Sequence, residues 1–162
     1  QGLSLSTSSL GIEYLLFNVP IGTSSGIGRF YKDILGGDVV FKDRGRAKSA
    51  TVNLAGGKQA LIFRESSRNY GAYDNHHIAI YIADFSNPHK KLIELGLITE
   101  ESNKSQYRFT EIVDPQTGKK LYDLEHEVRS LMHPLYGRAL VNRNPMQSLG
   151  NYRHGSDSLL GF

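Results

Sequence analysis

The sequence contains no cysteine and no long apolar run, and each absence excludes a class of structure. Without a thiol the chain cannot form disulfides, zinc–thiolate sites or a cysteine nucleophile. No apolar run approaches the roughly 20 residues that a membrane-spanning helix needs, so we expect no membrane contact. Residues 1–10 are rich in serine and lack the basic start and apolar stretch of a signal peptide. These absences favour a cytoplasmic protein.

The chain also has little excess charge. It carries 19 Lys and Arg against 16 Asp and Glu, which gives a formal net charge of +3. Acidic and basic residues are interspersed along most of the sequence, so we expect no nucleic-acid partner. With 162 residues, 39% of them hydrophobic, the chain can bury a core as one domain or as two small joined modules.

The first half of the chain predicts a strand, a helix and three further strands. The apolar segment Ile12–Val19 is typical of a strand. A helix is indicated by an apolar stripe with i, i+3, i+4, i+7 and i+8 spacing, formed by Ile27, Phe30, Tyr31, Ile34 and Leu35. We expect Ser24 or Ser25 to cap its start and Gly36 to end it. The three strands are expected over Val39–Lys42, Ser49–Leu54 and Ala60–Arg64.

The same order of elements returns in the second half, after a polar linker. His77–Ile82 alternates as a strand does, and Asn87 with Pro88 is expected to start a short helix that continues to Leu95. Three strands are expected over Leu97–Thr99, Tyr107–Val113 and Leu121–Val128. Asp114–Gly118 (DPQTG) forms the turn before the last of them.

This repetition predicts an α+β fold of two tandem βαβββ modules. The expected divisions are a flexible lead-in (1–11), a first module (12–65), a linker (66–76), a second module (77–128) and a C-terminal extension (129–162). A four-stranded sheet with one helix leaves its other face bare. Two copies can pair their bare faces and enclose a cup, which is a physical reason both for the duplication and for a binding site.

Three segments resemble the vicinal oxygen chelate superfamily, which includes glyoxalases, bleomycin resistance proteins and extradiol dioxygenases. They are RFYKDILGGDVVF, HHIAIYIAD and DPQTGKKLYDLEHE, and the resemblance covers roughly residues 12–128. It implies a U-shaped cleft, a homodimer, and one divalent metal ion bound by side chains on the first and last strands of the modules. Such a site suits Fe, Mn, Zn, Ni or Mg.

The resemblance implies five candidate metal ligands in this sequence. Alternation along its strand puts His77 on the face away from the helix, whereas His76 points the other way. Asp123 and Glu125 share the cleft-facing side of the closing strand, while Tyr122 and Leu124 would face the helix layer. Either carboxylate can match the family's terminal ligand, and both stay open.

In the first module Glu65 is the equivalent carboxylate, and the opening strand departs from the family pattern. There Tyr14 falls opposite His77, and a one-residue shift would place Glu13 at that position instead.

Two functions remain open from the sequence. The first is a metal-dependent lyase, isomerase or dioxygenase that acts on a small molecule with adjacent oxygens, with Tyr14, Tyr81 and Tyr107 lining the substrate cleft. The second is a metal-free small-molecule-binding protein of the bleomycin-resistance kind, which the missing first-module histidine favours. In the C-terminal extension Arg129 and His133, with Arg138 and Arg143, could hold an anion, or the extension could dock on the sheet or on a second subunit.

Overall fold

The computed structural model describes residues 12–43, 47–68 and 71–137, so the predicted lead-in and residues 138–162 of the extension lie outside the described residues. The first module consists of β1 (Tyr14–Val19), α1 (Ser24–Asp33), β2 (Asp38–Lys42), β3 (Ser49–Leu54), a 3-10 turn η1 (Ala55–Gly57) and β4 (Gln59–Glu65). The second consists of β5 (His77–Ile82), α2 (Ser86–Glu94), β6 (Ile98–Asn103), β7 (Gln106–Val113) and β8 (Lys120–Ser130). Neither helix is long and apolar enough to cross a membrane, as far as the described residues go.

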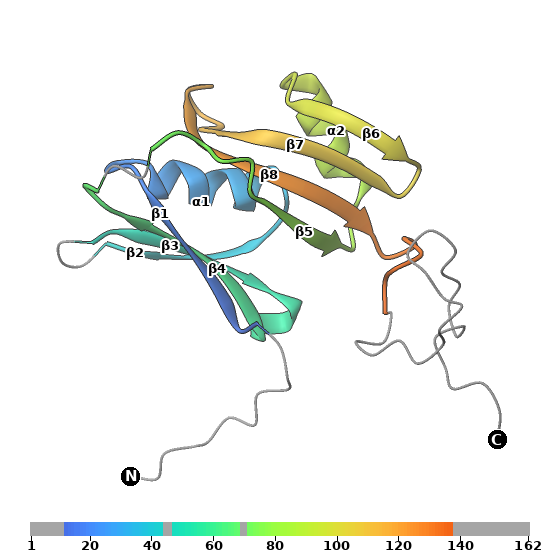
Figure 1. Ribbon diagram of the computed structural model, residues 1–162, viewed down its shortest axis with the longest axis horizontal. Coiled ribbons are helices and arrows are strands. Elements are labelled where there is room, and N and C mark those ends of the chain that lie inside the picture. The colour runs from blue at the N-terminus through green and yellow to red at the C-terminus, as the bar shows by residue number, and fades with distance from the viewer. Residues whose placement is uncertain (1–11, 44–46, 69–70, 138–162) are drawn as a thin grey trace, which may run out of the picture. The chain divides into compact units, whose positions relative to one another are not determined.

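Both modules build the same four-stranded sheet. The strand orders are β1-β4-β3-β2 and β5-β8-β7-β6, and in each the first strand runs parallel to the last. The predicted α+β fold of two βαβββ modules is therefore confirmed, and Figure 1 shows the two sheets with one helix each.

The apolar stripe predicted for the first helix packs on the first sheet. Ile27, Phe30 and Tyr31 are buried against β2, β3 and β4, and the Tyr31 and Phe63 ring centroids lie 5.2 Å apart. The stripe therefore buries the helix on one sheet face, as its spacing indicates.

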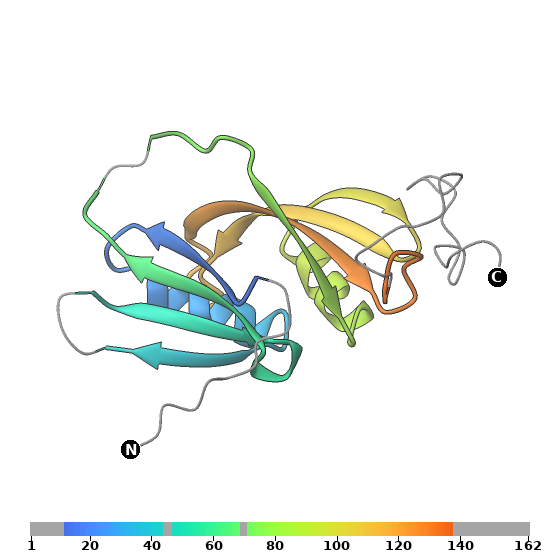
Figure 2. The same ribbon diagram turned by 60° about the horizontal axis from the view of Figure 1, so that its bottom comes forward.

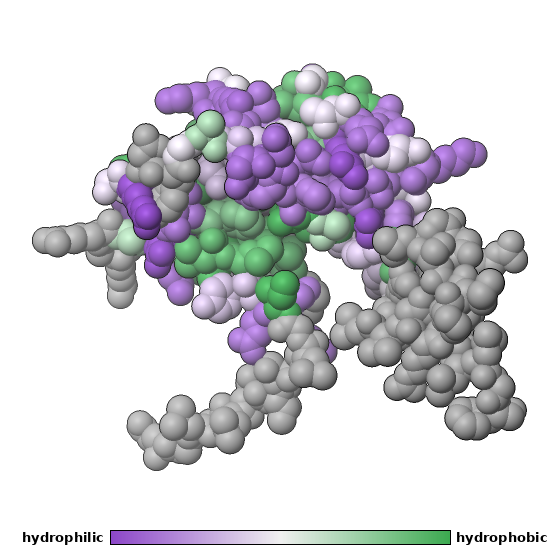
Figure 3. Space-filling model, in the orientation of Figure 1, coloured by the Kyte–Doolittle hydropathy of each residue, from purple (hydrophilic) through white to green (hydrophobic). Residues whose placement is uncertain are grey.

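The opposite face of the first sheet carries an apolar row. Strand register aligns Leu16, Ile62, Thr51 and Val40 across the four strands. Leu16 and Val40 are 37% and 46% exposed, and Figure 3 shows apolar surface over β1 and β4. This face is thus partly apolar although no described element of the first module covers it.

Several local predictions differ from the structure, and one is the start of the second helix, which begins at Ser86 with Phe85 as its cap residue and not at Asn87. Helix α1 begins at Ser24 with Thr23 as its cap residue, and the Thr23 hydroxyl bonds the Pro20 carbonyl, so the expected cap by Ser24 or Ser25 is wrong. Strand β6 extends to Asn103, well beyond the predicted Thr99. Its sequence ITEESN has little alternation, but it is an edge strand whose backbone pairs with β7, and this pairing does not need apolar side chains.

The chain forms two compact units that do not follow the two repeats. Unit 1 contains the chain up to His76 together with Thr110–Leu124, and unit 2 contains His77–Phe109 and the chain from Glu125 onward. The far end of the β7–β8 hairpin thus belongs to the unit that holds the first module. Figure 2 shows the turn of this hairpin beside α1.

An ion pair joins this hairpin to α1 within unit 1. Arg29 Nη2 donates to Asp114 Oδ2 at 2.7 Å, while Asp114 Oδ1 accepts the Gln116 N–H at 3.0 Å. Gly26 allows the close approach, because a Cβ there would lie 2.5 Å from Leu121 Cδ1 and 3.2 Å from Asp114 Oδ2. The hydrogen bond from Arg29 holds the pKa of Asp114 below its ordinary value.

We expect this contact to make the protein less stable in acid. A carboxyl whose pKa is lower in the folded state stabilises that state above its unfolded pKa, about 3.9, and this contribution is lost as the pH falls through the folded pKa. Asp114→Asn should lower the free energy of unfolding at neutral pH by about 1–3 kcal/mol. Below about pH 4, the free energy of unfolding of this variant should fall less steeply with pH than that of the unchanged protein. Urea unfolding across this pH range measures both effects. The exposed Asp38→Asn variant is the control, and equal effects of the two substitutions would contradict the prediction.

Candidate functional site

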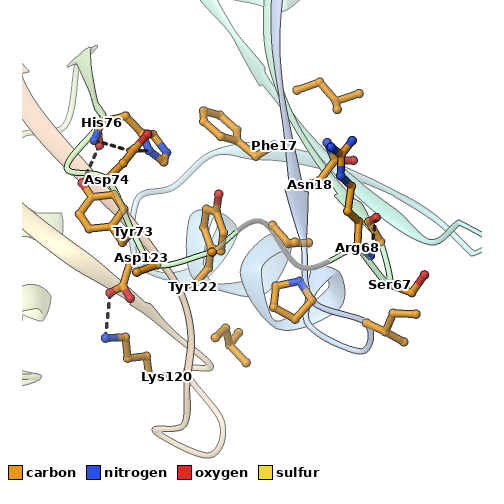
Figure 4. A pocket seen from close by; sticks show the side chains of 18 residues that line it. Phe17, Asn18, Ser67, Arg68, Tyr73, Asp74, His76, Lys120, Tyr122 and Asp123 are labelled. Atoms are coloured by element: carbon orange, nitrogen blue, oxygen red, sulfur yellow. Dashed lines mark hydrogen bonds and ion pairs between the residues drawn. The ribbon is translucent and has the colours of Figure 1, made fainter.

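Unit 1 contains a pocket of about 840 Å³. Four segments of the chain surround it: the end of β1, the segment after β4, the linker before β5, and the start of β8. Its labelled side chains in Figure 4 are Phe17, Asn18, Ser67, Arg68, Tyr73, Asp74, His76, Lys120, Tyr122 and Asp123. The volume falls in the range of small-molecule sites, which are typically about 300–1,000 Å³.

Aromatic rings form much of the pocket wall. The Phe17 ring lies between Phe63 and His76, with centroid separations of 5.3 and 6.2 Å and nearly parallel planes. Tyr73 meets the His76 ring edge-on at 5.1 Å. Rings packed on one another in this way give the pocket a rigid, largely apolar wall.

The His76 imidazole is fixed by the neighbouring Asp74. Asp74 Oδ1 lies 2.5 Å from His76 Nδ1 and also accepts the His76 backbone N–H at 3.1 Å. The Tyr73 hydroxyl donates to the His76 carbonyl at 2.5 Å. The bond from His76 holds the pKa of Asp74 below its usual range, so this carboxyl is ionised at neutral pH.

Tyr122 brings a hydroxyl to the pocket from strand β8. In Figure 4 this hydroxyl points into the space on the side of Phe17 and His76. Burial, and then the charge of Asp74, raise the pKa of Tyr122 above its usual value. The group is therefore a neutral hydroxyl at physiological pH, able to donate and to accept a hydrogen bond.

Charged side chains lie around the aromatic wall. Lys120 Nζ lies 2.8 Å from Asp123 Oδ1 and 3.0 Å from Glu111 Oε1, and hydrogen bonds to these two carboxylates raise its pKa. Asn18 Oδ1 accepts a bond from Arg64 Nη2 at 3.1 Å. The lysine in this pocket is thus already balanced by acidic partners.

Glu65, one of the predicted ligands, is buried against the start of α1. Its Oε1 accepts the Ser24 hydroxyl at 2.7 Å and the Ser24 backbone N–H at 3.1 Å. Burial acts to raise the pKa of Glu65, but hydrogen bonds from Ser24 and from the Gly22 and Ser24 backbone, with the charge of Lys48, hold it below its usual value. The first N–H groups of a helix have no partner within the helix, and a carboxylate in this position accepts a hydrogen bond from one of them. A metal ion at Glu65 would compete with these hydrogen bonds.

The other predicted ligands are divided between the two units. In unit 2, His77 lies directly opposite Glu125 on the neighbouring parallel strand, and Glu125 Oε1 accepts a bond from Arg108 Nη1 at 2.9 Å. In unit 1, Asp123 is paired with Lys120, and Glu13 is exposed just before β1. Metal ligation by all five residues together stays a prediction.

These positions allow a test of whether either unit fits a metal ion by itself. No three His, Asp or Glu side chains of the described segments gather into a metal-binding group. Glu65 is held by Ser24, and Asp123 and Glu125 are held by a lysine and an arginine. The donor sets within each unit therefore do not fit a metal centre.

The three tyrosines predicted to bind substrate have different surroundings. Tyr14 is 57% exposed at the start of β1, whereas Tyr107 is 1% exposed and packs between Phe85 and His89. The Tyr81 hydroxyl accepts a bond from Arg129 Nη1 at 3.0 Å. None of these tyrosines lines the unit 1 pocket, and their role in binding stays a prediction.

Unit 2 holds a second pocket of about 690 Å³ beside a dense ionic network. Arg108 bonds Glu125 and Glu127 at 2.9 and 2.5 Å, and Arg129 pairs with Glu127. Burial, and then the charge of Arg129, lower the pKa of His133. Both arginines are already neutralised, so this arrangement does not favour the anion site suggested by the sequence; Arg138 and Arg143 lie outside the described residues.

Of the residues that line the unit 1 pocket, the sequence analysis singled out Asp123 but did not select His76 or Tyr122. It placed His76 away from the expected cleft and Tyr122 towards the helix layer, and both line this pocket. The local signal for the first was the spacing of Asp74 and His76, which lets a carboxylate reach a ring two residues ahead. Tyr122 gave no local signal, because its place depends on how the hairpin packs against α1.

We expect Ser24→Ala to destabilise the protein by about 1–2 kcal/mol. The change removes the hydroxyl that donates to the buried Glu65 carboxylate and leaves that charge with one donor fewer. Ser25→Ala, one residue along and exposed, is the matched control and should change stability by less than about 0.5 kcal/mol. Chemical unfolding of both variants measures the difference, and equal stabilities would show that the Ser24–Glu65 bond contributes little.

Known proteins resemble the chain in structure and not in sequence. A scan of protein-family models gives no match, and no curated protein matches either. A glyoxalase family protein from Bacillus anthracis superposes with a TM-score of 0.52 at 19% identity, covering 75% of this chain and 95% of its own. The fosfomycin resistance protein FosX from Mesorhizobium loti gives 0.51 at 14% identity, covering 75% and 91%. A mutant of FosX from Listeria monocytogenes, complexed with Mn(II) and 1S,2S-dihydroxypropylphosphonic acid, gives 0.50 at 14% identity, covering 75% and 92%.

Proposed function

We propose that this chain, which has the fold of the vicinal oxygen chelate superfamily, binds a small organic molecule in the unit 1 pocket without a resident metal ion. The observation that carries the proposal is the pocket itself, with about 840 Å³ of space and aromatic walls contributed by separate segments. Its pattern of rings with a few polar groups is the usual composition of a small-molecule site.

Three candidate metal ligands already bond other side chains, and this supports ligand binding without a metal ion. A metal ion would have to displace the Ser24 donors from Glu65, Lys120 from Asp123, and Arg108 from Glu125. Breaking such charge-assisted contacts costs free energy that a metal–ligand bond would first have to offset. The pocket needs no such rearrangement, because its polar groups lie on its wall as folded.

A planar aromatic probe tests this proposal. The methyl ether of β-naphthol is neutral and fluorescent, and we expect it to bind chelator-treated protein. Tyr122→Ala removes one wall of the pocket and should weaken binding by about tenfold, which is the effect of losing one aromatic contact of about 1.4 kcal/mol. Fluorescence titration measures both affinities.

The control for this test is Tyr136→Ala, which changes an exposed tyrosine of unit 2. Its affinity should equal that of the unchanged protein. No binding by the unchanged protein, or equal losses in both variants, would refute a ligand site in unit 1.

A divalent-metal-dependent lyase, isomerase or dioxygenase is the second candidate. His77 and Glu125 favour it, because they lie side by side in register on the first and last strands of the second module. The FosX mutant from Listeria monocytogenes was complexed with Mn(II), which makes manganese the first ion to test. In this case a small molecule with adjacent oxygens would be the substrate. The homodimer and the cytoplasmic location likewise remain predictions from the sequence.

Metal analysis separates the two candidates. For protein purified without a histidine tag, we expect much less than one metal ion per chain, and no change in stability when Mn(II) is added to the unchanged protein or to His77→Ala. A ligand that binds only the folded state would raise its stability. One ion per chain that is lost in His77→Ala would instead support the enzyme.

A further inference from the structure

We propose that His76 Nε2 is the hydrogen-bond acceptor that selects the ligand of the unit 1 pocket, and that this ligand is a neutral planar aromatic molecule carrying a hydroxyl group. This inference rests on the proposed function, because it concerns the same pocket. It adds the residue that recognises the ligand and the chemical group that is recognised.

The contact with Asp74 decides which ring nitrogen of His76 is available. An ionised carboxylate can only accept hydrogen bonds, so the Nδ1 atom 2.5 Å from Asp74 Oδ1 must carry the ring proton. In the neutral form of the ring this leaves Nε2 unprotonated, so that it is a pure acceptor. Among the described residues no hydrogen bond to this nitrogen is present, so the acceptor is left for a ligand.

The ring that carries this acceptor is held in place. Phe17 stacks on it with an interplanar angle of 15°, and Tyr73 contacts it edge-on at 64°. Asp74 bonds both the ring and the backbone of the same residue. Asp74 is therefore a positioning residue, which sets the tautomer and the direction of the Nε2 lone pair.

The neighbouring groups define the class of ligand. Tyr122 places a neutral hydroxyl on the same side of the pocket, and Phe17 adds an apolar ring to the wall. The charged groups around the pocket are Asp74, Asp123, Lys120 and Arg68, and Lys120 is paired with Asp123. With a carboxylate directly behind His76, a neutral hydroxyl is favoured over an anionic oxygen, and an aromatic ring over a sugar or an aliphatic chain.

A pair of probes that differ in one hydrogen-bond donor tests the inference. β-Naphthol carries a hydroxyl, and its methyl ether has the same rings without the donor. In a mildly alkaline buffer, where histidines and phenols are both ordinarily neutral, we expect β-naphthol to bind about three- to tenfold more tightly than the ether. Fluorescence titration of the same protein with both probes gives this ratio.

Two variants test whether His76 and Asp74 cause the difference in affinity between β-naphthol and its methyl ether. His76→Phe keeps a ring beside Phe17 and removes the acceptor, so the ratio should fall to about one while the affinity for the ether is kept. Asp74→Asn should lower the ratio in part, because an amide can also donate to Nδ1 and so favour the other tautomer. Long-range ¹H–¹⁵N spectra, which report the tautomer, should show His76 protonated on Nδ1 in the unchanged protein and shifted towards Nε2 in Asp74→Asn. His89→Phe, in unit 2, is the control and should leave the ratio unchanged.

The outcomes distinguish the two proposals. If neither probe binds, the proposed function fails. If both bind with equal affinity, or if the ratio survives in His76→Phe, the pocket is real and the role of His76 is wrong. If the spectra place the ring proton on Nε2 in the unchanged protein, the role of Asp74 is overturned as well.

Discussion

The ion pair between Arg29 and Asp114 is the contact on which the arrangement of unit 1 depends. Asp114 starts the turn of the β7–β8 hairpin, and Arg29 lies on the helix of the other repeat. The pair is partly shielded from water, and Gly26 leaves room for the hairpin to approach α1. The pair fastens the turn of the hairpin to α1, and the strand that follows this turn brings Tyr122 to the pocket. A contact between distant parts of the chain therefore helps to position the candidate site.

Three of the predicted metal ligands are carboxylates that bond other parts of the chain. Glu65 closes the first turn of α1, Asp123 pairs with Lys120, and Glu125 pairs with Arg108. A buried or half-buried carboxylate needs such a partner, because a charge removed from water without one costs several kcal/mol. The sequence analysis gave these three carboxylates as candidate metal ligands at strand ends. In the structure their hydrogen bonds and ion pairs give them structural roles. Among the polar side chains that line the pocket, His76 and Tyr122 carry hydrogen-bonding groups on aromatic rings, which suits recognition by hydrogen bonds.

The two modules share a topology but differ in what their matching strands carry. In the second module His77 lies opposite Glu125, whereas in the first Tyr14 lies opposite Ala60. The first sheet keeps a strongly apolar helix interface and an apolar row on its other face, while unit 2 concentrates its paired charges near Arg108 and Arg129. The two modules thus share one backbone topology while their side chains at matching positions differ, as a fold that serves many functions allows.

The sequence by itself determined the elements and their order. Periodic apolar residues such as Ile27, Phe30 and Tyr31, and turn residues such as Asp114 and Gly118, act over a few positions, so their structural effect can be predicted locally. Only the tertiary structure decided that Glu65 caps α1, that Tyr122 reaches the unit 1 pocket, and that His76 meets Phe17 there. These contacts join residues far apart in the chain, and their partners are chosen by packing and by charge pairing, which no local pattern records.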